Sequence, residues 1–171
     1  MDIGQNFIDR SRAYLADEYR IKLRKTLATV SPELLWWRPN DESNSVGNLV
    51  MHLEGNVRQW IVGAIGGAPD VRNRAGEFAA KEGGTREELM RRMEQTLDEA
   101  DAVLAKLRPE QLTERRRVQA RDVSVLDAVY QVVQHFALHL GQIILVAKAQ
   151  VPGAVKFYED AGGNARPVWR E

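Results

Sequence analysis

The sequence predicts an all-α protein, a four-helix bundle with an additional short helix and irregular connections. Three observations lead to this expectation. Four long segments repeat apolar residues at helical spacing, capping signals precede several of them, and no segment alternates apolar and polar residues convincingly. We expect a single domain over residues 1–171, with a core over about 2–150 and a C-terminal surface tail over 151–171.

The composition is ordinary for a globular chain and excludes several classes of partner. Hydrophobic residues make up 44% and charged residues 28%, while Lys+Arg and Asp+Glu both number 24. A net charge of zero gives no electrostatic reason to expect a nucleic acid or a membrane surface as partner. The first ten residues lack an apolar signal core, and we find no uninterrupted apolar run long enough to span a bilayer. The absence of cysteine excludes disulfides and thiolate ligands, and it fits a cytoplasmic protein.

The first predicted helix covers about residues 2–30, with an apolar stripe on one side and charged residues elsewhere. A short second helix should begin at Ser31 and Pro32, because serine is a good N-cap and proline suits the first helical position. The adjacent Trp36 and Trp37 follow. Since neighbouring side chains cannot face the same way, one should pack on the core while the other lines a rim or cleft.

The third helix is expected over about residues 46–65, after serine and asparagine residues that can cap it. An irregular, polar connection over residues 70–84 follows, with Phe78 as its expected anchor. The fourth helix should then begin after a capping box formed by Thr85 and Glu88 and run to about residue 107. The next segment, to about residue 123, is predicted to be a connection with a short extended piece near its middle.

The last long helix is expected from Ser124 to about Ala149, with Asp127 completing another capping-box pair. Apolar residues cover much of its circumference, which predicts a place in the middle of the bundle. This helix carries His135 and His139, one turn apart on the same face.

Only three histidines occur in the chain, and all lie on the two helices most central to the predicted bundle. The third is His52. Taken singly, each is most simply a core residue whose ring nitrogens bond a carbonyl or hydroxyl. A shared metal ion would instead satisfy all three buried imidazoles at once. Spacing and placement alone leave both interpretations open.

A metal at this site would have an incomplete protein shell, because three ligands leave a position for water or substrate. Imidazole suits zinc, nickel, copper or iron better than magnesium or calcium. Gln142 lies on the same helix face as the two histidines of that helix. Its side chain has two possible roles: it contacts a metal ligand or the substrate, or it makes a hydrogen bond between helices. The same two interpretations hold for Asn48, Asn56 and Gln131, and Glu18 is expected on a solvated face.

Two stretches resemble the DinB-like (YfiT-like) superfamily: the stretch from Asn44 to Leu53, and His-Phe-Ala-Leu-His-Leu-Gly-Gln-Ile over residues 135–143. The resemblance implies a four-helix bundle in which His52, His135 and His139 hold a divalent metal. Characterised relatives include thiol-dependent transferases and isomerases, in which the metal binds the sulfur of a low-molecular-weight thiol. Several relatives form dimers.

The leading hypothesis is therefore a metal-dependent S-transferase that acts on an electrophilic small molecule. Its cofactors would be Zn, Ni or Fe and a low-molecular-weight thiol, with Gln142 and Asn48 as candidate cofactor-binding residues. Two alternatives stay open: a metal-dependent hydrolase, for which the sequence shows no general base, and a non-catalytic bundle that binds a ligand or a partner helix. The long apolar helices leave room for a homodimer.

Overall fold

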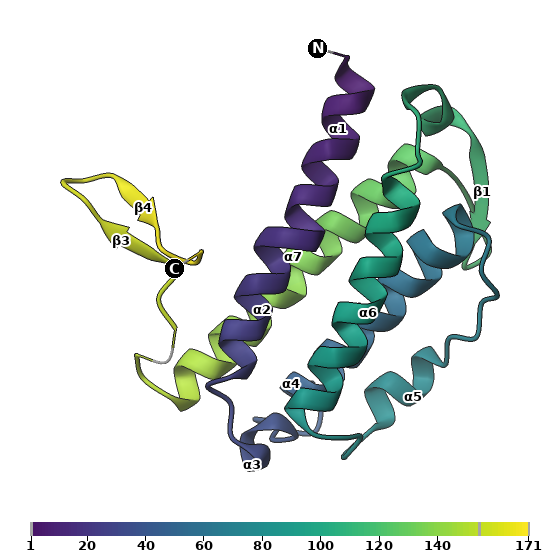
Figure 1. Ribbon diagram of the computed structural model, residues 1–171. Coiled ribbons are helices and arrows are strands. Elements are labelled where there is room, and N and C mark those ends of the chain that lie inside the picture. Colours follow the sequence, from purple (N-terminus) through teal and green to yellow (C-terminus); the bar gives the residue numbers. More distant parts are fainter. Residues whose placement is uncertain (1, 154, 171) are drawn as a thin grey trace.

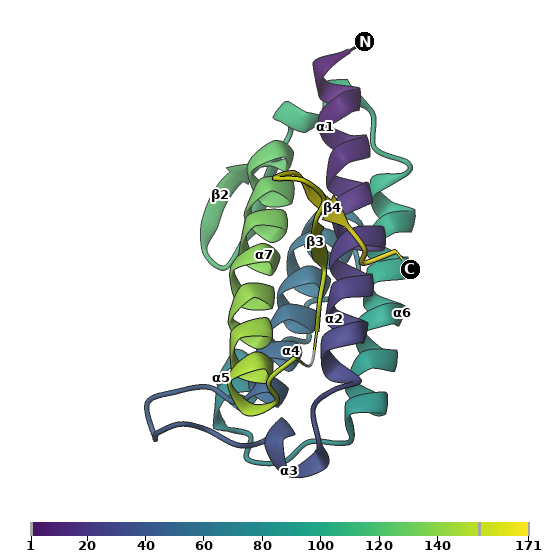
Figure 2. The same cartoon turned by 90° about the vertical axis from the view of Figure 1, so that its left-hand side faces the viewer.

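The computed structural model describes residues 2–153 and 155–170. Four long helical rods run side by side in two views related by a 90° turn, and shorter elements connect them (Figures 1 and 2). This arrangement confirms the predicted all-α four-helix bundle. Each rod turns an apolar face toward the others, and together these faces enclose one large core cluster.

The first rod is a continuous helix whose middle third is π-helical. It consists of α1 (Ile3–Arg12), η1 (Ala13–Tyr19) and α2 (Arg20–Leu27). Asp2 caps its start by accepting a hydrogen bond from the Gln5 backbone amide. The short helix α3 (Pro32–Leu35) then begins at the N-cap Ser31, as the sequence predicted.

The second rod consists of α4 (Val46–Val57), which continues as the π-helical segment η2 (Arg58–Ile65). Ser45 and Asn48 cap its start with a reciprocal capping box. At Gly47 an added Cβ would lie 2.7 Å from the Trp36 ring, so this close approach requires glycine. Trp36 thus packs half-buried against α4, whereas Trp37 is 40% exposed, as expected for adjacent tryptophans.

Two connections are more ordered than the sequence indicated. The 70–84 segment contains a short helix, α5 (Arg74–Ala79), which precedes the third rod, α6 (Arg86–Leu104). After the 3-10 helix η3 (Pro109–Thr113), strands β1 (Arg115–Val118) and β2 (Arg121–Ser124) form an antiparallel hairpin. Its turn residues Gln119 and Ala120 have φ of 49° and 60°, a conformation usually supplied by glycine or asparagine. The sequence therefore lacked the usual hairpin signal.

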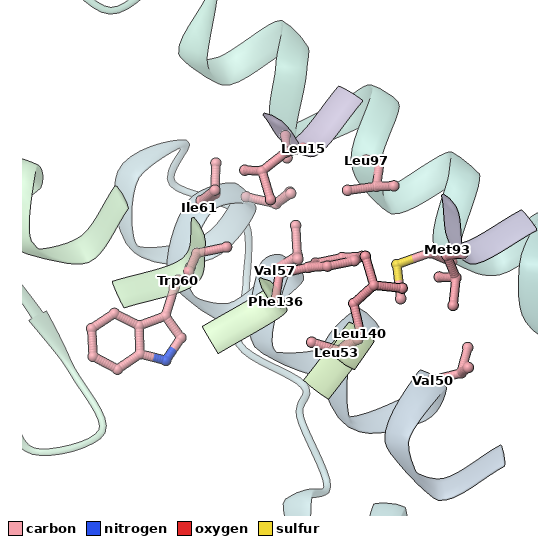
Figure 3. Close-up of a cluster of buried hydrophobic side chains, with 14 of the residues drawn as sticks. Leu15, Val50, Leu53, Val57, Trp60, Ile61, Met93, Leu97, Phe136 and Leu140 are labelled. Carbon is pink, nitrogen blue, oxygen red and sulfur yellow. The ribbon is translucent and has the colours of Figure 1, made fainter. Parts of the chain in front are cut away.

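The fourth rod, α7 (Val125–Gln150), begins at the predicted capping box of Ser124 and Asp127. Its inner face packs Phe136 and Leu140 against side chains from the other rods (Figure 3). Its outer face exposes four large apolar side chains, so the helix is two-sided rather than buried all round: Leu126, Tyr130, Leu138 and Leu145. The homodimer stays a prediction, and this face is open to it.

The sequence predicted no apolar run long enough to span a bilayer, and α7 qualifies this prediction. Among the described residues, α7 is the one helix whose length and composition would allow it to span a membrane. Histidine and glutamine residues interrupt its apolar sequence, so α7 contains no uninterrupted apolar run. Its length and mean hydropathy are nevertheless those of a helix that could span a membrane. Core helices of helical bundles pass the same test, and the inner face of α7 contributes eight buried residues to the core.

The C-terminal tail folds back on the bundle through a second hairpin, β3 (Tyr158–Asp160) and β4 (Ala165–Pro167). Val155, Phe157 and Trp169 form a small apolar cluster against residues of α2 and α7. The buried Lys22 amine reaches this tail and donates a 3.0 Å hydrogen bond to the Tyr158 hydroxyl. An ion pair between Arg170 and Asp17 of η1 adds a further contact, so the predicted surface tail is anchored on the first rod and on α7.

Candidate metal centre

The three histidines meet between α4 and α7. One ring nitrogen from each of His52, His135 and His139 lies within 4.8 Å of the others. The ring centroids are 5.0 Å apart for the 52–135 pair, 5.1 Å for 52–139 and 4.4 Å for 135–139. Residues separated by 83 positions in the sequence therefore form one cluster, which we call the histidine triad.

The nitrogen spacing in the triad fits a metal ion. Zinc–nitrogen bonds of about 2.0–2.1 Å in a tetrahedral shell separate two ligand nitrogens by roughly 3.3 Å. The Nε2 atoms of His52 and His135 are 2.9 Å apart, and the group spans up to 4.8 Å. The nitrogen–nitrogen separation that a tetrahedral zinc ion requires lies between these two distances. Two lone pairs that face each other this closely repel unless a proton or a metal ion lies between them.

A buried ion pair fixes the ring of His52. Its Nδ1 lies 2.9 Å from Glu77 Oε2, and Arg72 donates two hydrogen bonds of 2.7 and 2.8 Å to the same carboxylate. The three side chains are only 4–8% exposed. Because a carboxylate can only accept, the proton of His52 sits on Nδ1, and its Nε2 lone pair faces the other histidines. The Arg72 nitrogen 3.1 Å from Nδ1 is then only a close neighbour, since both atoms carry hydrogen.

This ion pair can lie against α4 because position 55 is glycine. A Cβ added to Gly55 would be 2.2 Å from Glu77 Oε1 and 3.0 Å from the Arg72 Nε. Asn48 supports the same arrangement from one turn before His52. Its amide Nδ2 donates hydrogen bonds of 2.8 Å to the carbonyls of Glu77 and Ala80. The structure therefore places Asn48 at the α4–α5 contact, where it anchors the segment that carries Glu77.

Gln142 contacts the triad at its exposed end. Its Oε1 lies 2.6 Å from the Nδ1 of His139 and accepts a hydrogen bond from the N–H there, which leaves the His139 Nε2 lone pair free. Two of the three imidazoles are thus held in the tautomer that presents Nε2. The Phe78 ring, whose centroid is 4.6 Å from that of His52, covers the cluster from α5. Glu18 lies elsewhere and binds Lys22.

The electrostatics of the cluster favour the neutral forms of His135 and His139. Burial, followed by the neighbouring His139 and His52 charges, lowers the pKa of His135 to about 4. Burial also lowers the pKa of His139, against the opposing effect of its hydrogen bond to Gln142. Burial alone would raise the pKa of Glu77, but hydrogen bonds from Arg72 and His52 outweigh it and lower that pKa. Neutral His135 and His139 near pH 7 suit metal binding, which requires imidazole nitrogens without a proton.

Glu77 and Arg72 are the residues that sequence reasoning missed. They lie in the connection predicted to be irregular, and α5 has only six residues. A signal was present in Asn73, whose side chain caps α5 by accepting a hydrogen bond from the Gly76 amide. Asparagine followed by a short run with one phenylalanine indicates a helical turn, yet it does not indicate which residue faces the triad.

Comparison with known proteins gives the chain a family. The model of the family DUF1572, described as "Protein of unknown function", matches residues 2–156. The chain belongs to the DUF1572 family. A crystal structure of the DinB-like protein YjoA from Bacillus subtilis is similar, with a TM-score of 0.66 and 16% identity over 88% of this chain and 97% of that one. This likeness shows a DinB-like fold for the DUF1572 chain and confirms the resemblance seen in its sequence. A search of curated proteins found no match.

Proposed function

We propose that this DUF1572 protein holds a divalent metal ion at His52, His135 and His139, and that it transfers a small-molecule thiol to an electrophile. The observation that carries the proposal is the triad itself, which offers three imidazole nitrogens within 4.8 Å of one another. The group contains three protein ligands among the described residues, which fits a catalytic site that keeps a position open.

The residues around the triad suit this role. Glu77 and Gln142 each accept a hydrogen bond from an Nδ1–H group, so they orient two rings toward the shared centre. Imidazole nitrogen favours Zn, Ni or Fe over calcium and magnesium. A divalent metal bound here would supply Lewis acidity that lowers the pKa of a thiol and keeps its sulfur in the nucleophilic thiolate form.

The nucleophile must come from outside the chain, because the protein has no cysteine. In the proposed transfer the thiol gives its proton to solvent, and its sulfur forms a bond to an electrophilic carbon. The leaving group departs from that carbon with the electrons of the broken bond. The protein contributes the position of the sulfur and the exclusion of water by the Phe78 side of the cluster. We propose a cytoplasmic setting, where small thiols are reduced.

Thiol transfer fits the site better than hydrolysis. Hydrolysis would need a general base within reach of the water. Glu77, the carboxylate that touches the triad, is bound by Arg72 and has a lowered pKa. A carboxylate with a lowered pKa is a weak base, and Glu77 already accepts a hydrogen bond from His52.

The direct test measures metal content and thiol conjugation together. Purified protein is loaded with zinc, nickel or iron and assayed with a panel of cellular thiols and a chromogenic aryl halide. We expect conjugation that a chelator removes and that His139→Ala lowers about a hundredfold or more. Lys148→Ala, at an exposed position on the same helix, should keep full activity. Full activity in the metal-free protein or in His139→Ala would contradict the proposal.

A further inference from the structure

A chain of hydrogen bonds links the turn of the β1–β2 hairpin to the ring of His52. Strand β1 packs on η2 (Figure 1), and the Gln119 side chain donates a 2.7 Å hydrogen bond from Nε2 to Oε1 of Gln59 in η2. The same Gln59 oxygen accepts a 3.0 Å hydrogen bond from Nη1 of Arg72. Arg72 pairs with Glu77, which accepts a hydrogen bond from Nδ1 of His52. Side chains from the hairpin, both parts of the second rod and the α5 region therefore form one continuous network.

The Arg72 guanidinium fills the space between Gln59 and His52. These two residues lie on the same face of the second rod, about two turns or roughly 10 Å apart along its axis. Nη1 of Arg72 bonds Gln59, and Nη2 donates a 3.3 Å hydrogen bond to the carbonyl oxygen of His52. Nε and Nη2 contact the two carboxylate oxygens of Glu77. Because a guanidinium is rigid and planar, fixing Nη1 also fixes the plane in which Glu77 meets the His52 ring.

Gln59 also anchors the segment that carries Arg72. Its Nε2 donates a 2.7 Å hydrogen bond to Oδ2 of Asp70, and Oδ1 of Asp70 accepts a 3.1 Å hydrogen bond from the backbone amide of Arg72. Residues 67–73 form no helix or strand, so contacts of this kind must hold them in place. A carboxylate only accepts and a guanidinium only donates, so one orientation of the Gln59 amide satisfies both neighbours. Gln59 thus fixes Arg72 through its side chain and through its backbone.

The backbone of Gln119 indicates that its side chain has a role. Its φ is 49°, and within the described part of the chain Gln119 and Ala120 are the non-glycine residues with positive φ. Two-residue hairpin turns with positive φ usually contain asparagine, aspartate or glycine, which adopt this conformation with less strain. Glycine at position 119 would relieve the strain, but it would have no side chain to reach Gln59. Strained residues cluster at functional sites, and the contact that glutamine makes here is the hydrogen bond to Gln59.

We infer that Gln59 and Gln119 are positioning residues of the metal centre, and that the β1–β2 hairpin thereby sets how tightly the triad holds its ion. Gln59 holds the Arg72 guanidinium, and Gln119 holds Gln59 from the hairpin. A His52 ring that is already fixed loses less rotational freedom when it binds a metal, so the ion binds more tightly. This role rests on the proposed function for the ion itself, whereas the hold on the His52 ring is present before any ion binds.

The first test measures zinc affinity by competition with a chromogenic chelator. Loss of a group that orients a metal-binding histidine weakens binding by about 10–100-fold, and we expect about tenfold in Gln59→Ala. Gln119→Gly should weaken binding by about threefold, because water can replace the exposed amide. Its unfolding temperature should be no lower than that of the wild-type protein, since glycine relieves the strain. Ala120→Gly relieves strain at the neighbouring turn position and keeps the Gln119 side chain, so it should bind zinc as the wild-type protein does.

The second test needs no metal. In metal-free protein labelled with 15N at histidine, NMR follows the Nδ1–H proton of His52, which is buried and bonded to Glu77. Its exchange with solvent should be about tenfold faster in Gln59→Ala, because the network opens more often. Gln5→Ala, at an exposed position of α1 where the side chain bonds Asp9, should leave the exchange rate unchanged.

The two measurements separate the positioning role from the proposed function. An unchanged exchange rate in Gln59→Ala would overturn the positioning role, and so would equal zinc affinities in Gln119→Gly and Ala120→Gly. Wild-type protein that binds no zinc, while the exchange rates follow the expected pattern, would instead overturn the proposed function and leave the hold on the His52 ring standing.

Discussion

The two sides of His52 are built differently, although both belong to the same helical rod. On the α5 side, Asn48, Glu77 and Arg72 each make two or more hydrogen bonds. On the α7 side, Asn56 and Trp60 each keep a buried polar atom without a partner among the described residues. A fully paired polar network fixes its members, whereas a buried donor or acceptor without a partner costs free energy and fixes nothing. We infer that the paired side of His52 is the side that holds the histidine ring in place.

The largest expected loss of stability comes from removing the Glu77 carboxylate, which pairs with Arg72. In Glu77→Ala the Arg72 guanidinium, with 4% of its side chain exposed, would stay buried without its partner. We expect the free energy of unfolding to fall by about 3–5 kcal/mol, the usual result of removing one member of a buried pair. Urea denaturation measures this, with the exposed Glu87→Ala as control. A loss below about 1 kcal/mol would show that the ion pair does not fix the site.

Two asparagines on α4 offer a matched comparison of the two sides. Asn48→Ala removes the N3 partner of the Ser45 capping box and two hydrogen bonds to carbonyls, and should cost about 2–3 kcal/mol. Asn56→Ala removes a side chain whose Oδ1 is already unpaired, so it should cost less than about 1 kcal/mol. Both are measured by denaturation of the metal-free proteins. Equal losses in the two variants would show that the two sides of His52 contribute equally to stability.

Metal affinity should respond more modestly to Gln142. Gln142→Ala removes the acceptor for His139 Nδ1, and loss of such a partner lowers metal affinity by about 10–100-fold. We expect the lower end, about tenfold, because Gln142 is exposed and water can take its place. Competition with a chromogenic zinc chelator gives the dissociation constant, and Lys148→Ala provides the control. An unchanged constant would mean that Gln142 does not orient His139.

The pH dependence of stability should reveal the partly buried His135. The pKa of His135 is about 4 in the folded protein, below its ordinary value of 6.5, so between these values the unfolded chain binds more protons. Stability of the metal-free protein is then fully present above pH 6.5 and falls as the pH drops toward 4. The loss should be about 1–2 kcal/mol, less than the full shift because the ring is only partly buried. Thermal denaturation at pH 7 and pH 5 measures it, and a His135→Gln protein should lose most of the difference.

Local signals account for the parts of the fold that the sequence revealed. Thr85 with Glu88 and Ser124 with Asp127 identified two helix starts, because capping boxes act within four residues. The face shared by His135 and His139 followed from helical period alone. Glu77 and Arg72 could not be found in this way. Their role depends on a close approach at Gly55, which is a contact between two elements and leaves no periodic trace.

Two other features escaped prediction for a similar reason. The π-helical segments η1 and η2 carry the same apolar pattern as an α-helix over one or two turns, so the sequence did not distinguish them. The β1–β2 hairpin turns at Gln119 and Ala120, whereas such turns usually contain glycine, asparagine or aspartate.

The central claim is that the triad binds a metal ion, and metal content tests it most directly. Protein purified without added chelator is analysed by elemental mass spectrometry, beside His52→Ala and His139→Ala prepared in the same way. We predict about one zinc, nickel or iron ion per chain in the wild-type protein and less than about a tenth of that in either variant, because each histidine supplies one of three ligands. Equal metal content in all three proteins, or wild-type protein that stays metal-free when zinc is supplied, would contradict this account.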